Sequence, residues 1–513
     1  MTRFFLCSLI AALISSGSWY PRRALFLAVG FSRPNAHAHD ELNSEFILAT
    51  NAFFSIQTPP CDIAAIGVQS AMIAATQTAS ASNLQSSSKP IYCRIFVALG
   101  SPYFRRISYM SSSGKGSARE GMKMRLASRV KTLSSSPTMA VSAEAARLKS
   151  EGKEIIDFSV GEPDFNTPDN IKDKGLEAIQ RNFTRYPPAA GIADLREAVA
   201  LKYRQQYGVD YSVAEVAISC GAKHTLFNLA FVLFEEGDEV LLPVPYWVTF
   251  PEQVKMVGAT PVEVETEEKD NFIIRAASLK QKITSRTKGI ILNSPNNPTG
   301  AVIPPDEMER IVNLALEHNL LLIFDECYEY FVFDGHEHWS LARFASKARH
   351  LSILVNTASK TYAMTGWRIG YLVAPKEIVK AVNDVQSHSA NPATISQKAA
   401  VESILGAQDS VQRMIAEYER RRKFVVEQLN SMPGLTCSNP AGAFYAFPNI
   451  SKFLSGRLKD SIEFSSALLR QAGVAVVPGS AFGKEGHVRI SFATSMENLE
   501  KGLGRMKKAL ENF

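Results

Sequence analysis

The sequence predicts an α/β fold in which helices cover both faces of a mostly parallel sheet. Short apolar runs typical of buried strands alternate with helical stretches from about residue 155 to 395, and this alternation indicates parallel βαβ units. The chain has 513 residues, which is too long for one ordinary core, so two or more domains are expected. Its composition, 46% hydrophobic and 21% charged, is ordinary for a globular protein.

The strands of this sheet are predicted from short apolar runs. They are Val216–Ser219, Glu239–Pro243, Gly289–Asn293, Leu321–Asp325, Ile353–Asn356 and Gly370–Ala374. Helices such as Pro305–His318 lie between them, as a parallel sheet requires. Before the sheet, Val141–Ser150 is typical of an amphipathic helix and Ile155–Val160 of a short strand.

A long helical stretch, residues 396–430, is expected to link the large domain to a smaller C-terminal one. In that smaller domain the runs Gly442–Phe447, Val474–Pro478 and His487–Phe492 are predicted strands, and Met496–Phe513 is a predicted closing helix. The sequence contains no visible internal repeat.

Residues 1–120 differ from the rest of the chain and carry its positive charge. A short apolar run, Phe4–Ile14, resembles the core of a signal peptide, and residues 63–119 have the composition of an organellar transit peptide. One interpretation is a two-step address to a plastid inside extra membranes. The other is upstream sequence before a true start at Met110 or Met122, which would leave a cytoplasmic protein. Residues 1–119 hold ten basic and four acidic residues, and the remainder holds 46 of each.

Charge and cysteine content therefore exclude several classes of partner. A body with no net charge gives no reason to expect nucleic-acid binding. The apolar run near the N-terminus is too short for a confident membrane span, so no stable membrane association is predicted. The six cysteines include no CxxC pair and no Cys/His cluster, so neither a disulfide framework nor a metal site is predicted.

Lys360 lies in the clearest chemical motif of the sequence. It follows a predicted buried strand and precedes the run MTGWRIG, which contains Arg368. A lysine in such a loop can form an imine with an aldehyde cofactor, and Arg368 can supply a fixed cation for a phosphate. Thr357 and Ser359 add hydroxyl donors. The small and aromatic residues between the two cations disfavour the alternative of two unrelated surface cations.

Asn297 and Asp325 each follow or end a predicted strand. Asn297 lies in the turn NSPNNPTG, at the edge where ligands of open α/β sheets bind, and can donate to a phenolate oxygen. Asp325 ends an apolar run, where a carboxylate needs a partner such as a protonated pyridine nitrogen. The alternatives are a plain turn for Asn297 and the cap of a following helix for Asp325.

The remaining candidates are a small-residue turn, an aromatic residue and an arginine. Gly221 and Ala222 begin a predicted helix, whose N-terminal N–H groups suit a phosphate. Trp247 follows another strand and can stack on a cofactor ring, although burial in a core is the usual fate of tryptophan. Arg489 lies in an apolar strand and needs a buried anion, either a substrate carboxylate or a structural salt bridge.

Each motif is ambiguous alone, but together they supply the groups that hold an aldehyde-pyridine-phosphate. From about Met124 to the C-terminus the sequence resembles the class I aminotransferases of fold type I, which depend on pyridoxal 5'-phosphate (PLP), and among them the bacterial-type aspartate and plastid aspartate/prephenate branch. The motifs that carry the resemblance are GEPDF (161–165), PYW (245–247), NNPTG (296–300), SK (359–360), MTGWRIGY (364–371), AGAFY (441–445) and VRISFA (488–493).

The resemblance implies a fold and a homodimer. The large domain would span residues 166–395 around a seven-stranded sheet. Residues 121–165 and 396–513, from the two chain ends, would form a small α/β domain. Tyr186 would reach the phosphate of a neighbouring subunit, so the active sites would be shared between two copies of the chain.

The resemblance also implies the roles of the site residues. Lys360 would bind the cofactor as an imine and, once released, move the proton between Cα and C4′. Asp325 would pair with the pyridine nitrogen, and Tyr328 and Asn297 would bond the ring oxygen. The other cofactor contacts would come from Gly221, Ala222, Lys223, Trp247, Thr357 and Arg368. The substrate contacts would come from Gly161, Ser136, Thr138, Lys223, Trp247, Asn297 and Arg489.

The implied reaction is a ping-pong transamination of dicarboxylic amino acids. Ser136, Thr138 and Lys223 match positions that read a distal carboxylate, which favours aspartate and glutamate with 2-oxoglutarate or oxaloacetate, and also suits prephenate. His224 stands where glutamine is expected, which bears on fine specificity. The alternatives are an aminotransferase of broader, aromatic or neutral specificity and a C–S β-lyase of the same fold. A PLP-binding regulatory protein is disfavoured because the extension shows no helix-turn-helix pattern.

Overall fold

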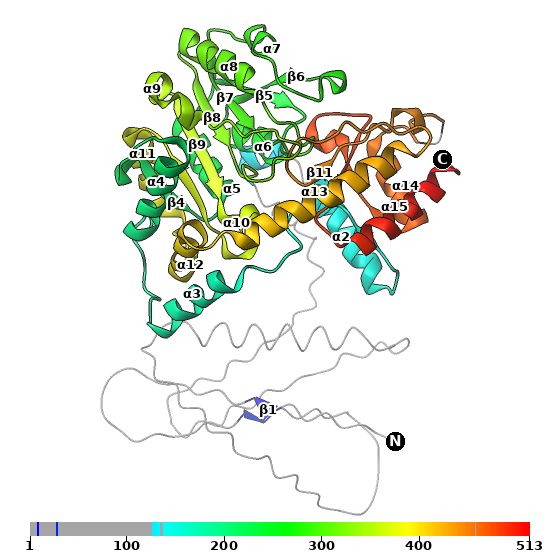
Figure 1. Cartoon of the computed structure of the whole chain (residues 1–513), viewed down its shortest axis with the longest axis horizontal. Helices are drawn as coiled ribbons and strands as arrows, with labels where there is room; N and C mark the ends of the chain where they lie inside the picture. The colour runs from blue at the N-terminus through cyan, green and yellow to red at the C-terminus, as the bar shows by residue number, and fades with distance from the viewer. Residues whose placement is uncertain (1–7, 10–26, 29–125, 134–136, 457) are drawn as a thin grey trace, which may run out of the picture. The chain divides into compact units, whose positions relative to one another are not determined.

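The computed structural model describes residues 8–9, 27–28, 126–133, 137–456 and 458–513, which belong to two units, Met1–Met122 and Lys123–Phe513 (Figure 1). In the first unit, β1 (Ser8–Leu9) and β2 (Leu27–Ala28) pair antiparallel. The rest of the predicted extension lies outside the described residues, so its targeting role stays a prediction. Among the described helices, none is both long and apolar enough to cross a membrane.

A seven-stranded sheet forms the centre of the second unit, in the strand order β4-β10-β9-β8-β7-β5-β6. Strand β10 is antiparallel to β9 and β4, and the other neighbours are parallel. The mostly parallel sheet predicted from the sequence is therefore confirmed. The strands are β4 (Val216–Ser219), β5 (Glu239–Val244), β6 (Thr260–Glu265), β7 (Thr287–Asn293), β8 (Leu321–Asp325), β9 (Ser352–Thr357) and β10 (Gly370–Val373).

Burial explains which strands the sequence revealed. Every residue of β4, β9 and β10 is buried, because helices cover both faces of the sheet, and such strands are continuous apolar runs. Strand β6 lies at the edge, with most of its residues partly or fully exposed, and its sequence TPVEVE is half polar. It is not one of the apolar runs that predict the sheet.

Helices surround this sheet in Figure 1, and one of them matches its predicted bounds at both ends. That helix is α8 (Pro305–His318), which begins with a proline and ends before Asn319 in the left-handed region. The other helices of this part of the chain are α3 (Asp169–Gln180), α4 (Ala193–Tyr207), α5 (Ala222–Leu233), α6 (Thr249–Met256), α7 (Ala276–Lys280), α9 (Ala345–Ala348), α10 (Ala358–Thr361) and α11 (Lys376–Ser389).

The predicted single helical stretch at 396–430 is wrong. It is two helices, α12 (Thr394–Leu405) and α13 (Asp409–Asn430), separated at Gly406, whose backbone is extended (φ −79°, ψ −171°). A side chain at Gly406 would meet Glu402, because a Cβ there would lie 2.2 Å from Glu402 Oε1. Helix α12 packs on α3 and α4, whereas α13 extends to the C-terminal helices (Figure 1).

The C-terminal part of the chain contains two small sheets. Strands β11 (Tyr445–Ala446), β14 (Val488–Ser491) and β13 (Val477–Pro478) form one, and β12 (Val474–Ala475) pairs parallel with β3 (Ile156–Asp157) in the other. The predicted strand at 474–478 is thus split between two partners. Helices α2 (Pro137–Ser150), α14 (Ser461–Ala472) and α15 (Met496–Leu510) pack here. The domain boundaries at 165 and 395 stay predictions.

Candidate active site

A cavity of about 620 Å³ brings most of the predicted site residues together. Its lining holds four cations, Lys223, Lys360, Arg368 and Arg489, and two acids, Glu162 and Asp325. The other lining residues are Ser142, Ser159, Val160, Gly161, Ala222, Trp247, Asn293, Asn297, Cys327, Tyr328, Thr357, Ser359, Thr365 and Tyr445. An excess of cations in a concave site is the arrangement expected for anionic ligands.

The direction of β10 explains why distant motifs meet at this cavity. Because β10 is antiparallel, its first residue, Gly370, pairs with Thr357 at the end of β9 and with Ser219 at the end of β4. The start of one strand therefore meets the carboxyl ends of its neighbours. This register places Arg368, just before β10, beside the turn that begins with Cys220, and the Arg368 guanidinium donates to Cys220 O at 3.1 Å.

Lys360 lies on α10, the short helix that follows β9 directly. Thr357 caps this helix, since its hydroxyl accepts a hydrogen bond from Ser359 N at 3.1 Å. The Lys360 ammonium donates to Gly161 O at 2.6 Å and has no acidic partner among the described residues. Burial lowers its pKa to about 8, and the nearby Arg489 and Arg368 add to the lowering.

Asp325 is the last residue of β8 and is only 4% exposed. Its carboxylate accepts a hydrogen bond from Cys327 N at 3.1 Å, and no side-chain cation pairs with it in the described chain. Burial raises the pKa of this carboxyl to about 6. The alternative of a helix cap is wrong, because a turn rather than a helix follows β8. A buried carboxylate without a cation is costly unless a ligand supplies one.

Arg489 lies on β14 and is 3% exposed. Its guanidinium donates to Asn297 Oδ1 at 3.0 Å and to Ser159 O at 2.7 Å, while its Nε has no hydrogen-bond partner among the described residues. Its Cζ lies 4.5 Å from the centre of the Tyr445 ring. No carboxylate pairs with Arg489 within the described residues, so the alternative of a structural salt bridge is wrong. A buried, unpaired guanidinium at a cavity needs an anion from outside the chain.

The turn before α5 has the geometry of a phosphate cradle. Gly221 adopts φ 84°, and a Cβ there would lie 2.4 Å from Arg368 Nη2, so a side chain would displace the guanidinium. Arg368 itself is left-handed (φ 58°) and donates to Thr365 O at 3.0 Å. Ala222 and Lys223, the first two residues of the 12-residue helix α5, line this side of the cavity, and the N-terminus of a helix suits an anion.

Lys223 and Trp247 lie together at the cavity wall. The Lys223 ammonium lies 5.2 Å from the centre of the Trp247 ring, and no described acid pairs with it. Burial lowers its pKa, and Arg368 adds to this. Asn297, after β7, uses its oxygen for Arg489 and keeps its amide NH₂ free of any hydrogen bond to the described residues.

Gly221, Tyr186 and His224, which the sequence highlighted, do not line the cavity, and the side chains of Ser136 and Thr138 lie outside the described part of the chain. Ser136 is outside the described residues, and Thr138 is described only as part of the backbone of α2. Tyr186 is 97% exposed and does not line the cavity of its own chain. His224 is not a lining residue of the cavity, and its Nδ1 accepts a hydrogen bond from Cys220 N at 3.3 Å.

Tyr445 is the main lining residue that sequence reasoning missed. Its hydroxyl lies 2.9 Å from that of Tyr328, and a Cβ on Gly161 would lie 3.1 Å from it. The motif AGAFY was a signal for the position, but not for the role. Cys327 and Glu162 were also missed; Cys327 directly precedes Tyr328, and Glu162 directly follows Gly161, both of which were predicted.

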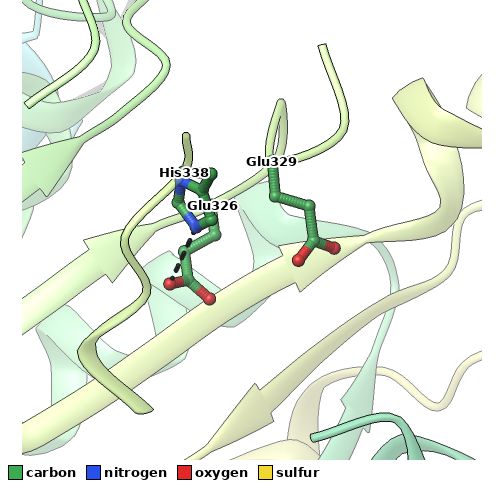
Figure 2. Close-up of side chains that lie close together, drawn as sticks. All are labelled: Glu326, Glu329 and His338. Atoms are coloured by element: carbon green, nitrogen blue, oxygen red, sulfur yellow. Dashed lines mark hydrogen bonds and ion pairs between the residues drawn. The ribbon is translucent and has the colours of Figure 1, made fainter. Parts of the chain in front are cut away.

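A second buried polar cluster begins at Glu326, the residue after Asp325, and we call it the buried charge cluster (Lys202, Glu326, Glu329 and His338). Figure 2 shows its two acids and its histidine. His338 Nε2 lies 3.2 Å from Glu326 Oε1, and Lys202 forms an ion pair with Glu329. Glu329 also accepts from Asn356 Nδ2 at 2.7 Å. Two acids and a histidine could ligate a metal ion, but the Lys202 ammonium already supplies a cation here, so we interpret the cluster as an ion-pair network.

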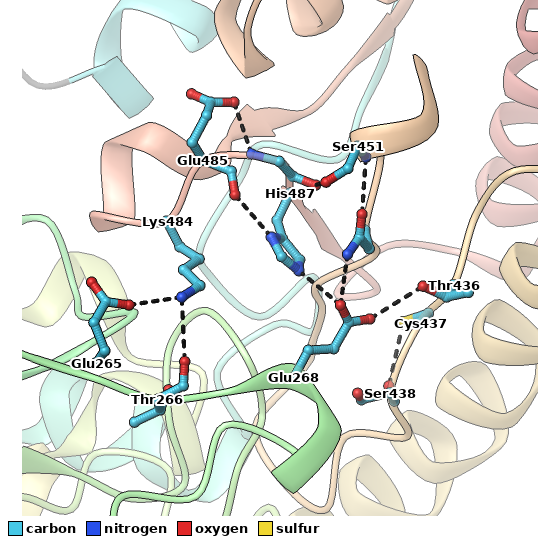
Figure 3. A network of polar contacts seen from close by, with 12 residues as sticks. Glu265, Thr266, Glu268, Thr436, Cys437, Ser438, Ser451, Lys484, Glu485 and His487 are labelled. Carbon is cyan, nitrogen blue, oxygen red and sulfur yellow. Dashed lines mark hydrogen bonds and ion pairs between the residues drawn. The ribbon is translucent and has the colours of Figure 1, made fainter. Parts of the chain in front are cut away.

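A third network supports the strand that carries Arg489 (Figure 3). Glu268, in the 3₁₀ helix after β6, accepts from Asn449 Nδ2 at 2.6 Å, from Thr436 Oγ1 at 3.2 Å and lies 3.3 Å from His487 Nε2. His487 immediately precedes β14 and stacks on Phe447 with ring centres 4.9 Å apart. These contacts tie the start of β14 to the region after β6.

Comparison with known proteins identifies the class. Residues 153–506 match the family of class I and II aminotransferases. The chain is 43% identical to the aspartate aminotransferase of Bacillus sp. (strain YM-2), over 75% of this chain and 99% of that protein. It is 41% identical to the aspartate/prephenate aminotransferase of Thermus thermophilus, over 75% and 98%.

Solved structures agree with this assignment. The aspartate aminotransferase of Rhizobium meliloti has a TM-score of 0.73 at 37% identity, over 76% of this chain and 99% of that one. The aspartate aminotransferase of Thermus thermophilus with maleate has a TM-score of 0.72 at 41% identity, over 75% and 100%. The chain therefore belongs to the class I and II aminotransferases. It is an aminotransferase of fold type I that uses PLP.

The cavity fits this cofactor. Asp325 has no side-chain cation as partner in the described chain, and a pyridine nitrogen would supply one. The absence of a side chain at Gly221 lets the Arg368 guanidinium lie against the start of α5, where it is a cation for a phosphate. Lys360 is a buried amine with a lowered pKa, as an aldehyde requires. The free NH₂ of Asn297 and the Tyr328 hydroxyl are donors for a ring oxygen.

Proposed function

We propose that this enzyme transfers the amino group between aspartate or glutamate and a 2-oxo acid, and that it also accepts prephenate. One observation carries the proposal: the cavity holds four cations against two acids, and none of these cations has an acidic partner among the described residues. A cofactor phosphate and the two carboxylates of a dicarboxylic substrate would balance this charge. The names of the relatives support the choice of substrates.

Arg489 would bind and orient the α-carboxylate of the substrate. Its guanidinium is held in a fixed position by Asn297 Oδ1, Ser159 O and the Tyr445 ring. A fork held in this way binds a carboxylate through two hydrogen bonds and loses little entropy on binding. Orientation of the substrate about this anchor would set which bond at Cα is perpendicular to the cofactor ring, and hence which bond breaks.

Lys360 would move the proton at Cα. Its pKa of about 8 leaves a substantial fraction of neutral amine near neutral pH, and only the neutral amine can accept a proton. When bound, PLP supplies an electron sink for the negative charge that develops at Cα. The Asp325 carboxylate would hold a proton on the pyridine nitrogen and so maintain that sink, while Trp247 excludes water from one face of the ring.

Lys223 would read the distal carboxylate of the substrate. It is an exposed cation at the cavity wall, and a cation without an acidic partner among the described residues favours a second negative charge there. The same group would serve aspartate, glutamate and prephenate, which all carry two carboxylates. Contacts from Ser136 and Thr138 stay predictions.

The experiment is a comparison of donors for the unaltered enzyme and Lys223→Met. Aspartate, glutamate, alanine and phenylalanine are tested with 2-oxoglutarate, and oxaloacetate and prephenate are then tested as acceptors. We expect kcat/KM for aspartate to fall about 10- to 100-fold in Lys223→Met, since one charged hydrogen bond is lost, while alanine stays within about twofold because it makes no distal contact. Equal rates for alanine and aspartate in the unaltered enzyme would contradict the dicarboxylic assignment.

We also propose a homodimer in which Tyr186 completes the phosphate site of the partner subunit. Tyr186 is 97% exposed, which is unusual for a tyrosine unless another molecule covers it. Mixed dimers of Lys360→Ala and Tyr186→Phe subunits test this proposal. If sites are shared, each hybrid carries one intact site and one doubly altered site, so mixing restores activity. If Tyr186 serves its own chain, both sites of the hybrid stay impaired.

A further inference from the structure

Tyr445 contacts two residues that have separate roles in the proposed function. Its side chain is fully buried on β11, the strand next to β14. Its hydroxyl lies 2.9 Å from the Tyr328 hydroxyl, and its ring centre lies 4.5 Å from Arg489 Cζ. One side chain therefore joins the group that would bond the cofactor oxygen to the group that would bind the substrate carboxylate.

The number of available protons fixes the direction of the hydrogen bond between the two tyrosines. Each phenol carries one proton. If Tyr328 donates its proton to the cofactor ring oxygen, the 2.9 Å contact must use the proton of Tyr445. Burial raises the pKa of Tyr445, so this phenol stays protonated. Its hydroxyl has no other hydrogen-bond partner in the described chain, so no other acceptor competes.

We propose that Tyr445 is a positioning residue that donates a hydrogen bond to Tyr328 and holds the Arg489 guanidinium with its ring. The inference rests on the proposed roles of Tyr328 and Arg489. Consecutive hydrogen bonds in a buried site polarise one another, so a donor behind Tyr328 makes Tyr328 a stronger donor. A guanidinium over an aromatic face is also attracted to it. The hydroxyl and the ring therefore have separable functions.

Tyr445→Phe tests the hydroxyl, because the substitution keeps the ring. The readout is the absorbance of the imine between Lys360 and the cofactor in the full-length holoenzyme, measured as a function of pH. The midpoint of this titration reports the protonation of the Lys360 nitrogen. Without the donor, Tyr328 neutralises the ring oxygen less, and the greater negative charge there holds a proton on the Lys360 nitrogen more tightly. We expect the titration midpoint to rise by about half a pH unit. The dissociation constant of maleate should stay within about twofold, because the ring remains under Arg489.

Tyr445→Leu tests the ring. It removes both the hydroxyl and the aromatic face, so it should shift the titration in the same direction as Tyr445→Phe. In addition, the dissociation constant of maleate should rise about threefold to thirtyfold, the range of a buried cation–π contact. If the two variants bind maleate equally well, the proposed function of the ring is wrong.

Tyr418→Phe is the matched control, because Tyr418 is buried in the same aromatic cluster, with its ring centre 5.4 Å from Phe444. Tyr418→Phe should leave the titration midpoint unchanged. An equal shift in this control would contradict the proposed hydrogen bond from Tyr445 to Tyr328. Tyr328→Phe separates the remaining outcomes. If Tyr445 acts through its hydrogen bond to Tyr328, Tyr328→Phe should raise the titration midpoint, and the double variant Tyr328→Phe with Tyr445→Phe should show no further change. If Tyr328→Phe shifts the midpoint and Tyr445→Phe does not, the proposed role of the Tyr445 hydroxyl is wrong and the proposed role of Tyr328 stands. If neither variant shifts the midpoint, both are wrong.

Discussion

The cavity and the buried charge cluster contain similar side chains but differ in how their charges are partnered. In the cluster, Lys202 pairs with Glu329, and Glu326 lies against His338. In the cavity, Lys360 and Arg489 have no acidic partner among the described residues, and their hydrogen bonds go to oxygen atoms of the backbone or of an amide. Two consecutive residues divide between these regions, because Asp325 lines the cavity and Glu326 belongs to the cluster.

This difference indicates which buried charges serve the fold and which serve a ligand. An ion pair closed within the chain stabilises the fold relative to the same pair with one partner removed. An unpaired buried charge destabilises the free protein, and it persists because a ligand compensates it. Removing a charge should therefore have opposite effects on stability in the two regions.

The largest expected effect is on activity, in Lys360→Ala. Loss of the amine that binds the cofactor and moves the proton should lower kcat for aspartate and 2-oxoglutarate by about 10⁴-fold. The free energy of unfolding of the cofactor-free protein should rise at pH 7. The reason is that the substitution removes a buried ammonium whose pKa is lowered to about 8. Urea unfolding and steady-state rates measure the two effects. Retention of more than about 1% of the rate would contradict the assigned role.

The next effect should be on stability, in Glu329→Gln. This substitution removes the acid that pairs with the buried Lys202 ammonium, and should lower the free energy of unfolding by about 3–5 kcal/mol. Glu309→Gln is the control, because the Glu309–Lys347 pair is exposed and should contribute less than about 1 kcal/mol. Replacing both partners, Lys202→Met with Glu329→Leu, should recover much of the loss. If Glu329→Gln unfolds like the control, the cluster is not the closed network described here.

The sequence predicted many of the residues that line the cavity, and fewer details of the fold. Asp325, Asn297 and Lys360 each lie at or just after the end of a buried strand, and local apolar runs reveal such ends. Parallel strands then bring their carboxyl ends to one edge of the sheet. Arg489 was recognisable because a charge inside an apolar strand needs a partner.

The features that the sequence did not reveal depend on contacts between distant segments. Tyr445 and Tyr328 are 117 residues apart, and their contact arises only when β11 packs against the turn after β8. Strand β6 is a largely exposed edge strand, and half of its residues are polar, so it does not form an apolar run in the sequence. The break between α12 and α13 begins at Gly406, and an isolated glycine does not reveal a break, because isolated glycines are tolerated in many helices.

The smallest expected effect sharpens the comparison through its pH dependence. Burial raises the pKa of Asp325 from 3.8 to about 6, so between these values the folded protein binds a proton that the unfolded chain lacks. The stability of the cofactor-free protein should therefore fall as pH rises from about 4 to 6, by up to about 3 kcal/mol for this group, and stay low above pH 6. A cation from the cofactor would reverse this penalty.

Asp325→Asn removes the titrating group and keeps its shape. Cofactor-free Asp325→Asn should be as stable as the unaltered protein near pH 4 and more stable at pH 7.5, by up to about 3 kcal/mol. The difference between the two urea-unfolding curves isolates Asp325, because all other titrating groups are common to both proteins. A difference that does not change with pH would mean that Asp325 already has a cationic partner in the free protein. The contrast between unpaired charges in the cavity and paired charges in the buried charge cluster would then not hold for Asp325.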